Sequence, residues 1–226
     1  RTIIEDKNEV SLQVERDITQ HLKLTYTAYS FSTLKQFDRD TKTDLRTQNI
    51  AKTGPLFEYD TRDNVFYPTT GIYASLGAEY SDPYLGSSED IAQSIRFAKV
   101  NGTISLPIRL GKNPDFVFAT SLRGGYLANL SNLPQGGVPA QEAFFLGGRS
   151  TIRGFQPSGA ANDLERVPNL VQLGKSQLRD FYVTSDSYYA LIKAELRFPL
   201  YGDFQGALFY DGGAVLLSQV HLDDPY

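Results

Sequence analysis

Runs of about ten residues in which apolar and polar side chains alternate recur along most of this chain. The clearest run, residues 72–80, places Ile72, Ala74 and Leu76 on one face, with small or polar residues between them. Because successive side chains of a β-strand point to opposite faces, this pattern predicts strands that separate an apolar from a polar environment. No segment has the 3.6-residue periodicity of a substantial helix. Similar runs occupy residues 10–14, 22–28, 56–62, 100–108, 116–126, 188–198 and 206–216.

The connections between these predicted strands are alternately short and long. Tight turns are expected near residues 17–20 and 111–115, whereas residues 82–90 and about 129–186 are predicted to be long loops. Residues 37–53 are so rich in charged and hydroxyl side chains that the whole segment is predicted to be a long solvated loop. Long loops that alternate with tight turns are typical of outer-membrane barrels. The predicted fold is therefore all-β, an antiparallel transmembrane β-barrel with about eight strands in this chain.

A soluble β-sandwich is the competing structure, because its strands show the same alternation. Strand length and the order of short and long connections favour the barrel. In the barrel, one set of apolar side chains faces outer-membrane lipid instead of packing between two sheets. That set is Ile72, Ala74, Leu76, Ile104, Leu106, Ile192 and Leu196.

The composition is compatible with a membrane barrel and argues against a nucleic-acid-binding protein. The mean hydropathy of −0.31 does not argue against a barrel, because alternation cancels in any average. With 22 basic and 26 acidic side chains the net charge is −4, which argues against nucleic acid as a partner. Cys and Met are both absent, and Arg1 opens a segment without the order of a signal peptide. The chain is therefore expected to be a processed or truncated piece.

The stretch from Phe144 to Pro157 is neither strand nor helix by pattern. Glycines lie on both sides of Arg153, so the backbone can turn sharply and approach other atoms closely. Such a loop could fold back into the barrel and place one guanidinium at a chosen point. The alternative is a glycine-rich surface loop.

The facing of the last two strands suggests what this loop contacts. If Tyr188, Ile192 and the residues in step with them face lipid, then Glu195 and Asp211 point into the barrel from adjacent strands. Two neighbouring carboxylates repel each other or bind a cation, and Arg153 is the candidate, through a bidentate contact. The alternative, that a water-filled lumen tolerates both carboxylates unpaired, stays open.

No pattern of residues predicts an enzyme, a metal site or a cofactor. The chain lacks a Gly-x-Ser-x-Gly elbow and a phosphate-binding glycine loop before a helix. His21 and His221 each stand alone, without a second ligand at metal spacing. Asp60 and Asp63 could act as an acid–base pair, but their position beside Arg62 at a turn favours a role in capping that turn.

Four motifs stand in order along the chain: the turn at residues 59–71, Ile-Arg-Gly-Phe at 152–155, Ala-Glu-Leu-Arg-Phe-Pro at 194–199 and Phe-Tyr-Asp-Gly-Gly at 209–213. Together these motifs resemble the outer-membrane assembly-factor superfamily of the BamA and TamA type. They cover most of the chain from Glu58 onward, in the family's order, and the one departure is Val65 where the family's turn has Pro. The resemblance gives roles to three groups of residues. The loop signature is Ile152, Arg153, Gly154 and Phe155; the partners on the lumen wall are Glu195, Phe209, Asp211 and Gly213; and the turn motif contains Asp60, Arg62, Asp63, Pro68 and Gly71.

The resemblance implies a larger barrel of about sixteen strands. Residues 1–226 would then be part of a C-terminal transmembrane β-barrel domain, with the POTRA modules and the remaining strands outside this chain. The strand near Val10 is therefore expected not to pair with the strand near Phe209. The resemblance further predicts that Phe155 lies near Phe209.

The implied function is assembly and insertion of client β-barrel proteins in a bacterial-type outer membrane, without enzymatic activity and without a cofactor. The implied partners are outer-membrane lipid, unfolded client β-barrel proteins, and accessory lipoproteins or periplasmic factors. The alternatives are a two-partner-secretion translocator, which exports an unfolded partner protein through its pore, and a passive porin.

Overall fold

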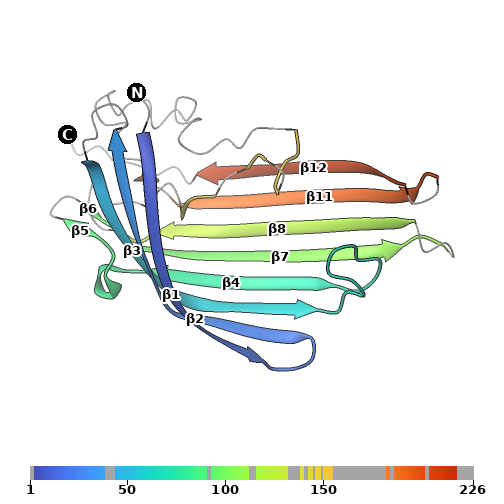
Figure 1. Ribbon diagram of the computed structural model, residues 1–226, viewed down its shortest axis with the longest axis horizontal. Helices are drawn as coiled ribbons and strands as arrows, with labels where there is room; N and C mark the ends of the chain where they lie inside the picture. The colour runs from blue at the N-terminus through green and yellow to red at the C-terminus, as the bar shows by residue number, and fades with distance from the viewer. Residues whose placement is uncertain are drawn as a thin grey trace, which may run out of the picture.

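The computed structural model describes residues 3–38, 44–90, 93–111, 116–131, 138–139, 142–144, 146–148, 150–154, 182–183, 186–201 and 204–217. Eight strands form one antiparallel sheet in the order β1-β2-β3-β4-β7-β8-β11-β12 (Figure 1). Among the described residues, no helix is long and apolar enough to cross a membrane. The strands of this sheet are β1 (Ile3–Asp17), β2 (Leu22–Asp38), β3 (Asp44–Asp60), β4 (Tyr73–Ser81), β7 (Phe97–Arg109), β8 (Val117–Asn129), β11 (Ser187–Pro199) and β12 (Gln205–Leu217).

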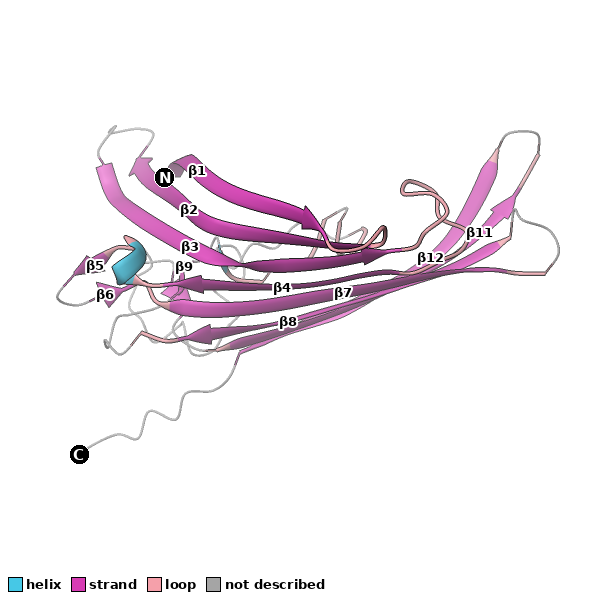
Figure 2. Ribbon diagram, turned by 90° about the horizontal axis from the view of Figure 1, so that it is seen from below, coloured by secondary structure: helices cyan, strands magenta, loops and turns pink. Residues whose placement is uncertain are grey.

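The sheet is an open, curved wall. Figure 2 shows that β1–β3 and the β11–β12 hairpin both rise toward one side, which leaves a concave face between them. Along the described residues β1 pairs with β2 and β12 with β11, so the predicted lack of pairing between the Val10 and Phe209 strands is confirmed. Two small two-stranded ribbons, β5 (Glu89–Asp90) with β6 (Gln93–Ser94) and β9 (Val138–Pro139) with β10 (Tyr182–Val183), and a 3₁₀ turn η1 (Pro83–Leu85) complete the described structure.

The convex face is apolar, as the alternation predicts. Leu76, Ile104 and Ile192 are exposed on this face, and Ala74 and Leu196 are half-buried on it. No second sheet covers them among the described strands, so the β-sandwich alternative is wrong. A row of outward tyrosines crosses the wall near the end that carries the long connections: Tyr26, Tyr80, Tyr126 and Tyr188.

The prediction that residues 37–53 form one long loop is wrong. Strand β3 begins at Asp44, and its register with β2 runs from Asp44 to Tyr59. The mistake has a physical reason, since a strand that projects beyond lipid needs no apolar face and has the composition of a solvated loop. The loop after β4 covers the free edge of this projection, where Ser88 N donates to Asn49 O at 2.8 Å and Ala51 N donates to Ser87 Oγ at 2.9 Å.

Strand β2 changes its facing where it enters this projection. The register with β3 shifts between Thr27 and Ser30, which marks a β-bulge. Tyr26, before the shift, faces outward, and Tyr29, within the shifted segment, does so too. The segment around η1 lies over this outer surface, because Tyr29 Oη donates to Leu85 O at 2.9 Å.

A small apolar cluster fills the concave side at the same end of the wall. Its members come from β3, β7, β8, β9 and the residue after β6, and Phe144 from the long connection packs against it. The cluster gives that connection an apolar seat inside the wall. It consists of Ile50, Ile95, Phe97, Leu127 and Val138.

Candidate functional site: a loop tip bound to the inner wall

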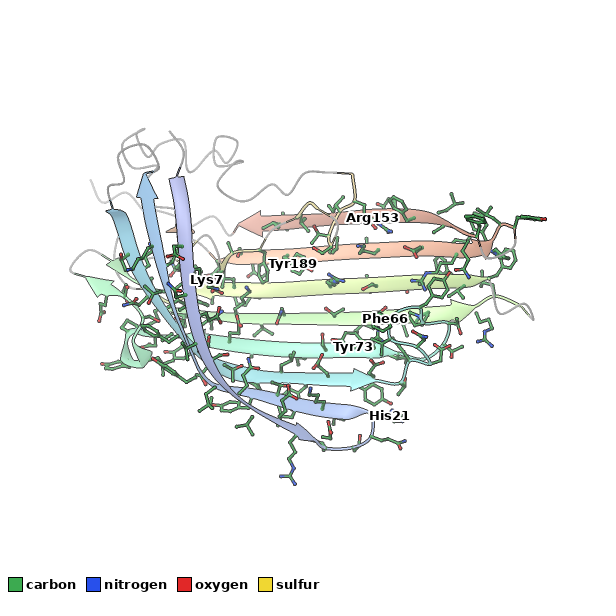
Figure 3. The ribbon with its side chains drawn as sticks, viewed as in Figure 1. Lys7, His21, Phe66, Tyr73, Arg153 and Tyr189 are labelled. Atoms are coloured by element: carbon green, nitrogen blue, oxygen red, sulfur yellow. The ribbon has the colours of Figure 1, made fainter. Side chains whose placement is uncertain are left out.

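The loop tip, residues 150–154, lies on the concave face against β11 and β12. Arg153 Nε and Nη2 donate to the two carboxylate oxygens of Asp211, each at 2.8 Å, and its Nη1 donates to Glu195 Oε2 at 2.9 Å. Its backbone N–H adds a bond of 3.0 Å to Asp211. Figure 3 shows Arg153 beside β11 and β12. The predicted contact of Arg153 with both wall carboxylates is therefore present, and the surface-loop alternative does not hold for this tip.

The wall residues meet Arg153 because of their register. Glu195 pairs with Phe209 and Lys193 with Asp211, so the inward faces of the two strands present both carboxylates side by side. The Asp211 side chain is only 2% exposed, against 23% for Glu195 and 28% for Arg153. The Arg153 guanidinium also lies 3.7 Å above the Phe209 ring, a cation–π contact. A planar guanidinium satisfies all of these partners at once, which an ammonium group could not do.

Glycines make room for the tip and shape it. A Cβ on Gly213 would lie 2.7 Å from a backbone oxygen of β11, so β12 tolerates no side chain there. Gly147, Gly148 and Gly154 all have positive φ, a backbone conformation that glycine adopts without the steric cost of a Cβ. Thr151 Oγ1 accepts a bond from Gly147 N at 2.7 Å and closes the turn before Arg153. Ile152 is half-buried beside Arg153, and Phe155 lies outside the described residues together with its predicted contact to Phe209.

A second anchor holds the same connection nearer its start. Lys52 Nζ donates to both carboxylate oxygens of Glu142, at 3.0 and 3.1 Å, and Lys99 Nζ donates to the Glu142 carbonyl at 2.9 Å. Phe144 stacks on Tyr189 with ring centroids 5.0 Å apart. This anchor was not predicted from the sequence. Its one signal was that Lys99 falls on the inward face of an alternating strand.

Gly125 is part of this anchor because it lies beneath the Phe144 ring. A Cβ on Gly125 would lie 2.5 Å from the Phe144 ring, so the ring occupies the space that a side chain at position 125 would need, a knob-and-hollow fit.

The turn between β3 and β4 is capped by its own carboxylates. Arg62 Nε and Nη2 donate to Asp60 at 2.9 and 2.6 Å, and Asp63 Oδ1 accepts from the backbone N–H of Thr69 at 2.8 Å. These bonds support the capping role over an acid–base pair. The hydrogen bonds from Thr69 hold the pKa of Asp63 below its ordinary value. Gly71, at φ 94°, ends the turn where a Cβ would lie 2.3 Å from a backbone oxygen.

The remaining predicted residues lie close to this turn. Pro68 is buried within it, and Val65, at the family's Pro position, is exposed at its tip. His21 lies at the β1–β2 turn, where its Nδ1 is 3.1 Å from Asp60 O, which is a structural contact. Among the residues that the structure describes, no three His, Asp, Glu or Cys side chains gather as metal ligands.

The comparisons with known proteins agree with this architecture. The family model of the Omp85 superfamily domain matches residues 2–223. The chain belongs to the Omp85 superfamily. Its predicted resemblance to BamA-type proteins, its barrel-wall fold and its outer-membrane location are thereby confirmed.

Two relatives of this Omp85 chain show how much of a larger protein it spans. The crystal structure of BamA from Haemophilus ducreyi lacking POTRA domains 1–3 matches 93% of this chain with a TM-score of 0.63. At 13% identity this likeness shows the fold alone, and the match covers 42% of that chain. A SAM50-like protein of Drosophila melanogaster is 31% identical over 110 residues, which are 49% of this chain and 22% of that protein. The Omp85 chain therefore spans less than half the length of both.

Proposed function

We propose that this Omp85 protein is an outer-membrane assembly factor that helps client β-barrel proteins fold into the membrane, without enzymatic chemistry. The observation that carries the proposal is the loop tip, which is bound to the inner wall through four hydrogen bonds from Arg153. A loop held there narrows the lumen and stiffens the strands that it joins. Family membership and the match to a SAM50-like protein support the same role.

In the proposed mechanism the chain described here is the part of the barrel that keeps its shape. Residues 1–226 belong to a C-terminal barrel domain of about sixteen strands, and a weak seam lies elsewhere in that barrel. An open strand edge at the seam pairs with the backbone of an incoming client strand, and a locally thinned bilayer lowers the cost of entry. The bond between the loop tip and the wall prevents the opening at the seam from spreading through β11 and β12.

The test uses the full-length protein in liposomes and a urea-unfolded, eight-stranded outer-membrane barrel as the client. Folding of the client is followed on a gel as the SDS-resistant band that is seen only in unheated samples. The proposal predicts faster client folding than in empty liposomes, and slower folding with Arg153→Ala than with Arg16→Ala, an exposed arginine on β1 that serves as the control.

Other results would replace the proposal. Transport of an unfolded partner across the bilayer without client folding would identify a translocator, and ion conductance alone would identify a porin. Accessory lipoproteins or periplasmic factors are also proposed partners, and they should copurify with the full-length protein.

A further inference from the structure

Arg197 on β11 contacts the β3–β4 turn and also Glu195, the wall carboxylate that binds Arg153 of the loop tip. Arg197 Nε donates to Glu195 Oε1 at 2.6 Å, on the carboxylate oxygen that Arg153 does not use. Its Nη1 donates to Pro68 O at 3.2 Å, and its guanidinium lies 4.6 Å from the centre of the Tyr67 ring. Arg197 is therefore the link between Glu195 and the β3–β4 turn.

The β3–β4 turn extends across several strands of the wall. Residues 61–72 leave the wall between β3 and β4, yet they contact β11, which lies beyond β7 and β8 in the sheet. At about 4.8 Å between strands, the turn crosses roughly 14 Å of wall. Figure 2 shows it rising from the concave side, and Figure 3 places Phe66 over β7. A second and separate contact, from Arg109 Nη2 to Thr69 Oγ1 at 2.7 Å, ties the turn to the end of β7.

Arg197 and Arg153 share the Glu195 carboxylate, and Lys193 lies opposite Asp211 on the neighbouring strand. Arg153 and Arg197 carry two positive charges, and Glu195 and Asp211 carry two negative charges. Each oxygen of Glu195 accepts from a different guanidinium, so Arg197 fixes the carboxylate in the orientation that Arg153 needs. Without Arg197, Glu195 Oε1 would lose its hydrogen-bond donor, and Arg153 alone would hold the carboxylate through Oε2.

We propose that Arg197 is a positioning residue that couples the β3–β4 turn to the loop tip, so that the two segments hold or release the wall together. The turn is anchored twice, by Arg197 and by Arg109, but only Arg197 also contacts the group that binds Arg153. A disturbance of the turn therefore reaches the loop tip through Arg197 and Glu195. This coupling does not depend on which client or partner the protein handles.

The test measures thiol labelling in the full-length, membrane-embedded protein with an impermeant maleimide. These 226 residues contain no cysteine, and any cysteine elsewhere in the full-length protein is first replaced with serine. Ile152→Cys then reports on the loop tip, and Pro68→Cys, which keeps the backbone carbonyl, reports on the turn. Arg197→Gln should raise the labelling rate about tenfold at both reporters, which corresponds to about 1.4 kcal/mol in the docking equilibria. Arg109→Gln, which loosens the turn at its other anchor, should raise the labelling rate at Pro68→Cys and, while Arg197 is present, also at Ile152→Cys. The matched control Arg16→Gln, an exposed arginine on β1, should leave both reporters within twofold.

Two results would overturn the proposal. If Arg197→Gln accelerates labelling at only one reporter, or at neither, Arg197 does not couple the two segments. If Gly71→Ala, which disturbs the turn, accelerates labelling at Ile152→Cys equally with and without Arg197, the coupling does not run through Arg197. Arg197→Lys, which keeps the charge but loses the planar fork, should give an intermediate rate and serves if the Gln variant yields too little folded protein.

Discussion

Removal of the Arg153 side chain should weaken docking of the loop tip by an amount that the contacts allow us to estimate. Arg153→Ala deletes three charge-assisted hydrogen bonds and the contact with Phe209, and it leaves Asp211, only 2% exposed, without its cation. Breaking a buried ion pair on one side costs about 3–5 kcal/mol. Because Arg153 and Glu195 are 28% and 23% exposed, water offsets part of that cost. We therefore expect a loss of about 2–4 kcal/mol, roughly 30- to 1,000-fold in the docking equilibrium.

The assay is urea unfolding of the full-length barrel in liposomes, read as loss of the SDS-resistant band in unheated samples. Arg153→Lys should lose about half as much as Arg153→Ala, because the charge remains and the fork does not. The informative variant combines Arg153→Ala with Asp211→Asn, which removes the charge left unpaired. Its loss should fall short of the sum of the two single losses by at least about 1.5 kcal/mol. Additive losses, within about 0.5 kcal/mol, would mean that Arg153 and Asp211 do not interact and would refute the reasoning.

Three further predictions concern the turn and the second anchor. Gly71→Ala should destabilise the folded barrel by a few kcal/mol, because the added Cβ would lie 2.3 Å from a backbone oxygen. Gly111→Ala, at φ 72° with no atom within 4 Å, should cost about 1 kcal/mol in the same melting experiment. Equal losses for the two variants would contradict this. Gly125→Ala should lower the melting temperature by displacing the Phe144 ring, and adding Phe144→Ala should recover part of the loss, so a purely additive double variant would argue against the knob-and-hollow fit. Because the folded pKa of Asp63 lies below its ordinary value, its stabilisation of the turn is complete above about pH 4 and is lost as the pH falls below that value; protease cleavage of the turn should rise over this range and should not depend on pH in Asp63→Asn.

Local alternation was enough to predict the strands of the central wall and the direction of their side chains. The facing of Glu195 and Asp211 followed from counting residues in two strands, and this count together with the resemblance to the assembly-factor superfamily was the basis for placing Arg153 between them. Such inferences succeed because period two is a property of each strand by itself. They need no knowledge of what lies opposite.

The features that were missed depend on distance in space. The start of β3 at Asp44 was hidden because a strand outside lipid has no apolar face to reveal it. Contacts of Lys52 with Glu142, and of Arg197 with the β3–β4 turn, join segments 90 and 129 residues apart. Nothing in either segment alone indicates its partner, so only the folded arrangement shows the second anchor and the link through Arg197.

The cover over the outer surface of β2 has a consequence for where the membrane ends. Lipid cannot occupy the surface beside Tyr29, because the η1 segment already lies on it. The hydrocarbon layer must therefore stop at or below the tyrosine row, a position at which tyrosines commonly meet the headgroups. From Tyr188 in that row to Phe198 near the far end of β11 there are about ten residues, or roughly 33 Å of strand, which a tilt of about 40° reduces to roughly 25 Å. That is the height of one outer-membrane hydrocarbon layer. The C-terminal half of β2 and the N-terminal half of β3 consequently project into water. A probe that cannot cross the bilayer should reach residues there, although backbone pairing makes them part of the barrel sheet.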